Sequence, residues 1–268
     1  MRTLVAAVAS LLAVALLGAV ALLSLARPAA PVEERRAADE LLVAAAADLQ
    51  LAFGELGRAF AAATGAEVRC TFGSSGQLAE QIVNGAPYDL FASANVAFVD
   101  EVIAAGRGVA ATKVTYAYGR IVLWSPRVRY RSLADLLDPR IRYVAIPNPE
   151  HAPYGRAAEQ ALRHAGVYAR VKRKLVYGES VADALRLVRS GNADVGIVAL
   201  SLAVGSGGRY TEIAPHRYEP LEQALVVTAS GERRALARRF ARFVTSEEGR
   251  SVLRRYGFLL PGERRGLS

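Results

Sequence analysis

Residues 71–82, TFGSSGQLAEQI, end a predicted strand and begin a predicted helix. The preceding segment, EVRCTF, alternates polar and apolar side chains as a strand does, and apolar residues recur with helical spacing after Ser75. Gly73 and Gly76 allow a tight turn and a close approach of the backbone to another group. Ser74 and Ser75 add hydroxyl donors to the free N–H groups of a helix start. The stretch therefore predicts a strand–loop–helix unit that can bind an anion, although GSSG taken alone favours an ordinary helix cap, with Ser74 or Ser75 capping its own helix.

Similar units recur along the chain, because apolar runs of four to seven residues alternate with longer stretches of helical period. This alternation is typical of an α/β fold with mostly parallel strands. About eight strands are too many for one small sheet, so we expect two lobes, each a mostly parallel sheet flanked by helices, with a ligand cleft at the hinge. We place the first lobe at residues 39–117 and 221–268 and the second lobe at residues 118–220. The predicted strands are LLVAAAA (41–47), EVRCTF (67–72), YDLFASA (88–94), YGRIVLWSP (118–126), RYVAIP (142–147), KLVYG (174–178), DVGIVAL (194–200) and LEQALVVTAS (221–230).

The N-terminal residues 1–38 are predicted to direct export. An uncharged apolar run, residues 3–26, follows Arg2 and leads into a linker rich in small residues and proline. The run is longer than the roughly 7–15 residues usual in a cleaved signal, so a signal peptide and a retained membrane anchor both stay open. In either case we expect the rest of the chain to lie in the periplasm or an equivalent extracytoplasmic space.

Charge and cysteine content exclude several classes of function. The formal net charge is +9, and many of the arginines near the C-terminus alternate with a periodic apolar stripe, which indicates an exposed helix face. We therefore expect no nucleic-acid partner. The single Cys70 rules out an intramolecular disulfide, and the sequence has neither a Cys and His cluster for a metal ion nor a nucleotide-binding loop. We expect a monomer without a cofactor.

Four segments are predicted to follow a strand and open a helix: AAADLQ (45–50), FGSSGQ (72–77), NPEHAPYG (148–155) and YGESVADA (177–184). In doubly wound sheets ligands bind at the carboxyl ends of the strands, where such helices begin. Helix starts expose free N–H groups and carry about half a positive charge. Each segment alone also fits a plain cap or loop. Together, facing one cleft, they would form an anion receptor built largely from backbone.

A serine hydrolase is the enzymatic alternative. It needs a base within reach of its serine, and Ser75 with His151 is the pair that we retain. The spacing of FGSSGQ does not match the G-x-S-x-G elbow of such enzymes. We therefore expect a binding protein and not an enzyme.

The same segments, together with GAPYDLFASAN, GNADVGIVALS and the late RYGF, resemble the periplasmic molybdate-binding proteins of ABC transporters over residues 41–260. The resemblance implies a type II periplasmic-binding fold that closes on molybdate or tungstate and delivers it to a membrane permease. By position it implies that Asp48, Ser75, Tyr154 and Val181 contact the oxyanion, with Ser74 beside them.

Two positions depart from the pattern of that family. Asp48 stands where a hydroxyl donor is usual, and Ala199 stands where a tyrosine is usual. We expect either Ser201 or the Tyr154 hydroxyl to replace the donor missing at Ala199.

The Asp48 carboxylate would repel a bound anion, by about 4 kcal/mol for two unit charges 4 Å apart at an effective dielectric constant of about 20. We therefore expect it to turn away and cap its own helix through the N–H of Gln50 or Leu51. The same carboxylate keeps a phosphate-binding transport protein open as an alternative, because hydrogen phosphate carries a proton that needs an acceptor.

Overall fold

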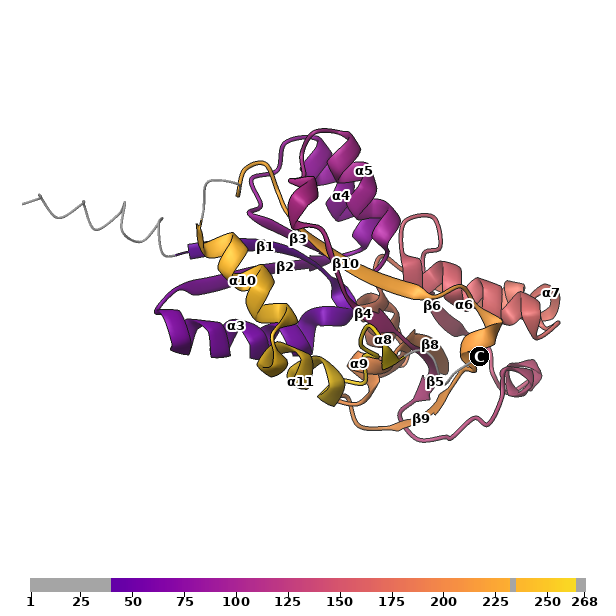
Figure 1. Ribbon diagram of the computed structural model, residues 1–268. Coiled ribbons are helices and arrows are strands. Elements are labelled where there is room, and N and C mark those ends of the chain that lie inside the picture. Colours follow the sequence, from indigo (N-terminus) through magenta and orange to yellow (C-terminus); the bar gives the residue numbers. More distant parts are fainter. Residues whose placement is uncertain (1–39, 232–234, 264–268) are drawn as a thin grey trace, which may run out of the picture. The chain divides into compact units, whose positions relative to one another are not determined.

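The computed structural model describes residues 40–231 and 235–263, which contain two five-stranded β-sheets flanked by helices (Figure 1). The predicted leader, residues 1–38, lies outside the described residues. In the part that is described, no helix has the length and apolar character needed to cross a membrane.

The first sheet is built from both ends of the described chain. Its strands, in spatial order, are β2 (Glu67–Gly73), β1 (Glu40–Ala46), β3 (Leu90–Ser93), β10 (Leu221–Val227) and β4 (Val114–Gly119). Strands β1, β2 and β3 are parallel, whereas β10 runs antiparallel to both of its neighbours. Ala46 pairs with Gly73 at the carboxyl ends of β1 and β2, so the segments that follow these two strands start side by side.

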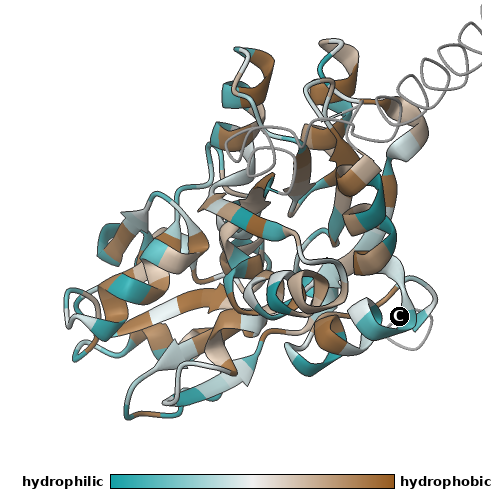
Figure 2. Cartoon of the chain, turned by 90° about the vertical axis from the view of Figure 1, so that its left-hand side faces the viewer, coloured by the Kyte–Doolittle hydropathy of each residue, from teal (hydrophilic) through white to brown (hydrophobic). Residues whose placement is uncertain are grey.

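Helices cover both faces of the first sheet (Figure 1). They are α3 (Gln50–Thr64), α10 (Ala235–Thr245) and α11 (Glu247–Arg255) on one face, and α4 (Ser75–Val83) and α5 (Val96–Ala104) on the other. On the first face Phe240 packs edge-to-face on Phe53 and Phe60, with ring centroids 5.9 and 5.1 Å apart. On the second face Leu78 and Phe91 belong to a separate buried cluster. Figure 2 shows hydrophobic residues along many of the strands, whereas the helices carry both hydrophilic and hydrophobic residues.

The second sheet follows the same plan. Its strands, in spatial order, are β7 (Leu175–Gly178), β6 (Val144–Pro147), β8 (Val195–Ala199), β5 (Ile121–Ser125) and β9 (Arg209–Glu212). Strands β6, β7 and β8 are parallel, and β5 runs antiparallel to β8 and β9. Its helices are α6 (Pro153–His164), α7 (Tyr168–Val171), α8 (Val181–Arg189) and α9 (Leu200–Ala203). Short 3-10 turns join the elements: η1 (Ala47–Leu49), η2 (Ala110–Thr112), η3 (Leu133–Leu137), η4 (Lys172–Lys174) and η5 (Pro215–Arg217).

The predicted two-lobed α/β arrangement is confirmed, with two differences in the strands. The predicted strand 118–126 is divided at Arg120, where the chain leaves β4 of the first sheet and enters β5 of the second. Strand β9 was not predicted, because its sequence RYTE is polar and only partly buried. The described residues belong to one compact unit, Asp39–Ser268. The exact lobe boundaries therefore stay a prediction.

Candidate functional site

The four predicted strand-end segments meet at one small cavity, of about 10 Å³. The first sheet contributes the segments that follow β1, β2 and β3, and the second sheet contributes the starts of α6 and α8. The lining residues are Ala46, Ala47, Asp48, Gly73, Ser74, Ser75, Ala94, Ala152, Pro153, Tyr154 and Val181. Of the predicted site residues, Asp48, Ser74, Ser75, Tyr154 and Val181 are thus brought together, whereas Ser201 is not among the lining residues.

Three helix starts contribute residues to the lining of this cavity. Ser75 and Val181 are the first residues of α4 and α8, and Tyr154 is the second residue of α6. The N–H groups of these three residues have no acceptor among the described residues. Their residues are 1%, 4% and 2% exposed, respectively, so water does not reach them freely. Buried N–H groups without partners are rare in folded proteins, and together with three helix dipoles they form a site that favours an anion.

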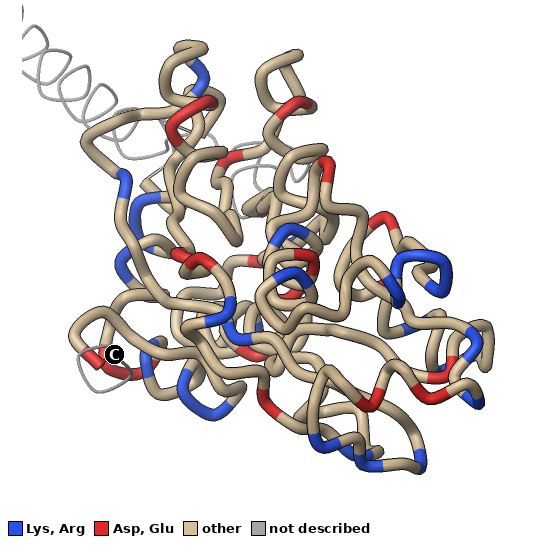
Figure 3. Tube along the Cα trace, turned by 90° about the vertical axis from the view of Figure 1, so that its right-hand side faces the viewer, with Lys and Arg blue, Asp and Glu red and all other residues tan. Residues whose placement is uncertain are grey.

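Side chains add no positive charge to the cavity. Among its lining residues Asp48 is the one with a formal charge, and none is lysine, arginine or histidine. Figure 3 shows lysines and arginines distributed along other parts of the described chain, with acidic residues among them. Nor do the described residues contain a cluster of histidine, cysteine, aspartate or glutamate able to hold a metal ion. An anion in this cavity would be held by neutral donors.

The Ser75 hydroxyl is oriented as a donor toward the cavity. Its Oγ accepts a hydrogen bond from the N–H of Ala94 at 2.9 Å, and the side chain is buried. Because a hydroxyl carries one proton and this proton has no acceptor among the described residues, Ser75 can donate to a bound oxyanion.

The neighbouring Ser74 has a different role. Its Oγ donates to the carbonyl oxygen of His151 at 2.5 Å, and the N–H of Gly76 donates to the same oxygen at 3.0 Å. Nearby, the Gln77 amide donates to the Glu179 carboxylate at 3.0 Å. These bonds join the start of α4 to segments of the second sheet, so they hold the two walls of the cavity together.

The structure contradicts the predicted pairing of Ser75 with His151. It is Ser74 whose Oγ lies 2.8 Å from Nδ1 of His151, because Ser75 turns toward Ala94. The Ser74 hydroxyl also donates a hydrogen bond to the His151 carbonyl oxygen. Ser75, the predicted nucleophile, therefore has no imidazole base at hydrogen-bonding distance among the described residues.

Asp48 does not cap its helix, so that prediction was wrong. It lies inside η1, and neither η1 nor α3 has a side-chain cap. Its fully buried Oδ2 instead accepts hydrogen bonds from the Tyr154 hydroxyl at 2.9 Å and from Nε2 of Gln223 at 2.6 Å. Burial raises the pKa of Asp48 from its ordinary 3.8 to about 6, and the hydrogen bonds from Gln223 and Tyr154 oppose part of that rise.

The second oxygen of this carboxylate, Oδ1, is buried and has no hydrogen-bond partner among the described residues. An unpaired buried carboxylate oxygen is costly, so this atom marks a place where a donor is missing.

Neither predicted replacement for the donor missing at Ala199 has a hydroxyl proton free for a ligand. Ser201 lies behind Asp48 and donates to its backbone carbonyl at 2.7 Å. The Tyr154 hydroxyl donates its hydrogen bond to the Asp48 carboxylate. Both hydroxyls therefore support Asp48 from within the protein.

Sequence reasoning missed Gln223 and Tyr116, which complete the surroundings of Asp48. The Tyr116 hydroxyl donates to Oε1 of Gln223 at 2.9 Å and so orients the amide whose Nε2 donates to Asp48. Burial raises the pKa of the Tyr116 and Tyr154 phenols well above 10, which keeps both protonated. The signal for Gln223 was its place as a polar residue in the apolar run LEQALVV.

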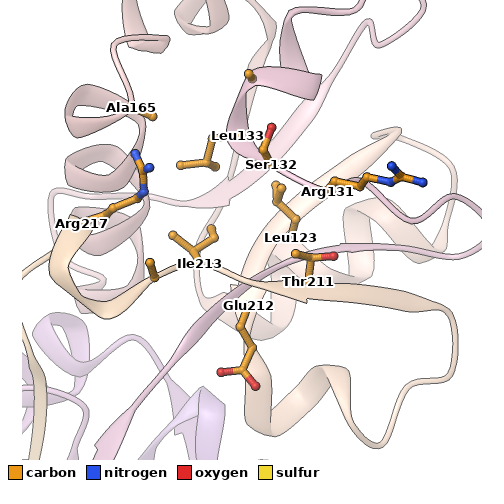
Figure 4. Close-up of a pocket in the computed structure, with 11 residues that line it drawn as sticks. Leu123, Arg131, Ser132, Leu133, Ala165, Thr211, Glu212, Ile213 and Arg217 are labelled. Carbon is orange, nitrogen blue, oxygen red and sulfur yellow. The ribbon is translucent and has the colours of Figure 1, made fainter. Parts of the chain in front are cut away.

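A larger pocket, of about 290 Å³, lies in the second lobe between β5, η3, β9 and η5 (Figure 4). Leu123, Leu133 and Ile213 lie on its inside beside polar residues, and the side chains of Arg131 and Glu212 point away from its centre (Figure 4). No α-helix begins among the residues that line it. It therefore lacks the converging donors that distinguish the smaller cavity.

Comparison with known proteins agrees with this geometry. The family model of the bacterial extracellular solute-binding proteins matches residues 41–259. The molybdate-binding protein ModA of Rhodobacter capsulatus is 35% identical over 225 residues, which cover 83% of this chain and 89% of that protein. The ModA protein of Azotobacter vinelandii is 34% identical over 227 residues, which cover 82% and 90% of the two chains. The solved periplasmic molybdate-binding protein of Azotobacter vinelandii superimposes with a TM-score of 0.78 at 33% identity, covering 82% and 99% of the two chains. The predicted two-lobed periplasmic-binding fold is thereby confirmed.

Proposed function

The chain belongs to the bacterial extracellular solute-binding protein family, and from this premise we propose that it binds molybdate or tungstate and delivers the anion to the permease of an ABC transporter. In this proposal the protein acts outside the cytoplasmic membrane as a monomeric binding protein and catalyses no reaction. Ser75, Tyr154 and Val181 hold the oxyanion, and Asp48 lies beside it.

One observation carries the proposal: three buried backbone N–H groups without acceptors surround a small cavity that has no cationic side chain. A fully ionised tetrahedral oxyanion offers acceptors at all four oxygens and needs only donors. Helix starts supply such donors and their positive dipole ends. Closure of the two walls excludes water and strengthens each contact.

Hydrogen phosphate is the second candidate ligand, favoured by the unpaired Oδ1 of Asp48, which can accept the proton of that ligand. Calorimetric titration with molybdate, tungstate, sulfate and phosphate separates the two. We expect molybdate and tungstate to bind tightest. Tight binding of phosphate alone would refute the molybdate assignment.

The Ser75→Ala variant is expected to bind molybdate more weakly by about 1.5–3 kcal/mol, because it loses a hydrogen bond to a charged ligand. Calorimetry measures the difference. Ser190→Ala, at the far end of α8, is the matched control and should bind as the wild type does. Unchanged affinity in Ser75→Ala would remove this hydroxyl from the site.

The Gly76→Ala variant tests the contact between the two walls. A Cβ at this position would lie 2.8 Å from the carbonyl oxygen of His151 and 3.1 Å from its Cα, so the walls must separate. We expect a loss of about 1–2 kcal/mol in binding free energy, the scale of a mild steric clash. Gly54→Ala is the control, because its added Cβ meets only the Arg58 side chain, at 3.7 Å. Equal affinities of the two variants would show that this contact does not support binding.

A further inference from the structure

We propose that the oxyanion binds together with one proton, and that this proton resides on Oδ1 of Asp48, where it turns the carboxylate into a hydroxyl donor facing the ligand. The inference rests on the proposed function, since it concerns how the same cavity accepts a doubly charged anion.

The hydrogen bonds of Asp48 divide its two oxygens into different roles. Oδ2 accepts from Tyr154 at 2.9 Å and from Gln223 at 2.6 Å, so it suits the carbonyl oxygen of a carboxylic acid. Oδ1 is buried and has no partner, and its residue lines the cavity. Protonation at Oδ1 therefore leaves every existing hydrogen bond of the side chain in place.

The same step removes two unfavourable features at once. An ionised Oδ1 would stay unpaired and would repel an anion held by the neighbouring N–H groups. A protonated Oδ1 donates to that anion and leaves no buried negative charge behind. The resulting hydroxyl stands at the position where the family resemblance leads us to expect a hydroxyl side chain.

Apart from the backbone of Asp48 itself, which also lowers its pKa, the groups packed around this carboxylate are neutral. Tyr154 faces it from α6 and Gln223 from β10, while Tyr116 of β4 reaches it through Gln223. Ser201 of α9 bonds only its backbone carbonyl. The lining residues include no lysine, arginine or histidine. The His151 imidazole is not among the lining residues; its Nδ1 lies 2.8 Å from the Ser74 hydroxyl and its Nε2 lies 3.6 Å from the Glu179 carboxylate.

The burial of Asp48 makes proton uptake accessible near neutral pH, because it raises the pKa of this carboxyl to about 6. About half of the free protein then carries the proton at pH 6, and about one molecule in a hundred carries it at pH 8. If only the protonated form binds the dianion, the apparent affinity for molybdate falls roughly 50-fold between these two pH values.

The test is calorimetric titration of the whole protein with molybdate at pH 7.5, in buffers of different protonation enthalpy. We expect an uptake of about one proton per molybdate bound. In Asp48→Asn, whose amide donates from the place of Oδ1, we expect no proton uptake and an affinity that is the same at pH 6 and pH 8. His151→Gln should retain the uptake, whatever its affinity, because its imidazole is not the group that is protonated.

Tight molybdate binding without proton uptake in the wild type would overturn the inference and leave the proposed function intact. An equal uptake in Asp48→Asn would also overturn it, since another group would then carry the proton. Binding of phosphate without uptake, and no binding of molybdate at either pH, would overturn the proposed function itself together with the inference.

Discussion

Replacing Asp48 with asparagine is expected to raise the free energy of unfolding by roughly 3 kcal/mol at pH 7.5, in the absence of any oxyanion. Burial raises the pKa of this carboxyl from 3.8 to about 6, so ionisation costs the folded state about two pKa units more than it costs the unfolded state. Each unit corresponds to about 1.4 kcal/mol. An asparagine has no charge to bury, and its carbonyl still accepts from Tyr154 and Gln223.

The pKa of Asp48 is higher in the folded state than in the unfolded state, and this difference sets how the stability gain of Asp48→Asn depends on pH. Below about pH 3 the carboxyl is protonated in both states, so wild type and Asp48→Asn should be equally stable. As the pH rises from about 3 to 6, the unfolded state releases the proton before the folded state does, and the wild type loses stability. The advantage of the variant should therefore be complete above about pH 7.

Chemical denaturation at pH 3, 5.5 and 7.5 measures this difference. Asp138→Asn is a control of opposite sign, because hydrogen bonds from Arg140 lower the pKa of Asp138 to about 2 and its charge stabilises the fold. That variant should be less stable than the wild type at pH 7.5. If Asp48→Asn were also less stable than the wild type at pH 7.5, the claim that the buried Asp48 charge destabilises the fold would be contradicted.

Replacing Val181 with proline is expected to weaken molybdate binding at least 100-fold, or about 3 kcal/mol. The substitution removes the N–H group of the first residue of α8 and places the proline ring where that hydrogen was. Proline is well tolerated at this helix position, which Pro153 occupies in α6. The preceding Ser180 is extended, with φ −140° and ψ 172°, so the backbone accommodates the ring.

The matched control is Val181→Ala, which shortens the same side chain but keeps the N–H group. We expect it to bind within a fewfold of the wild type, with both variants measured by calorimetry at the same pH. Circular dichroism and thermal unfolding show whether Val181→Pro remains folded. If the folded proline variant bound as tightly as the alanine variant, the backbone of α8 would not hold the ligand.

The meeting of the four strand-end segments was predictable because it follows from local pattern and from a general rule of parallel sheets. Each segment couples a buried strand to a helix start, and both are visible over ten or so residues. The edge strand β9 was not predictable in this way, because its four residues lack an apolar run.

The orientation of Asp48 was not predictable, because its partners are distant in sequence. Gln223 lies 175 positions further along the chain and Tyr154 lies 106 positions further. A local rule favours a helix cap for an aspartate at a helix start, and two long-range hydrogen bonds override it here.

The different roles of Ser74 and Ser75 depend on long-range contacts in the same manner. Both hydroxyls stand at one helix start, and the sequence offers no reason to separate them. The Ser74 hydroxyl donates a hydrogen bond to the carbonyl oxygen of His151, 77 residues away. The Ser75 hydroxyl instead accepts a hydrogen bond from the N–H of Ala94, which also lines the cavity.

The most direct test is a crystal structure of the protein with molybdate, in which the anomalous signal of molybdenum locates the anion. We predict one molybdate between the two sheets, with its oxygens about 2.7–3.2 Å from the backbone nitrogens of Ser75, Tyr154 and Val181. No lysine or arginine nitrogen should lie within that distance of the anion. A molybdate bound elsewhere, or one held in this cavity by an ammonium or guanidinium group, would contradict the account.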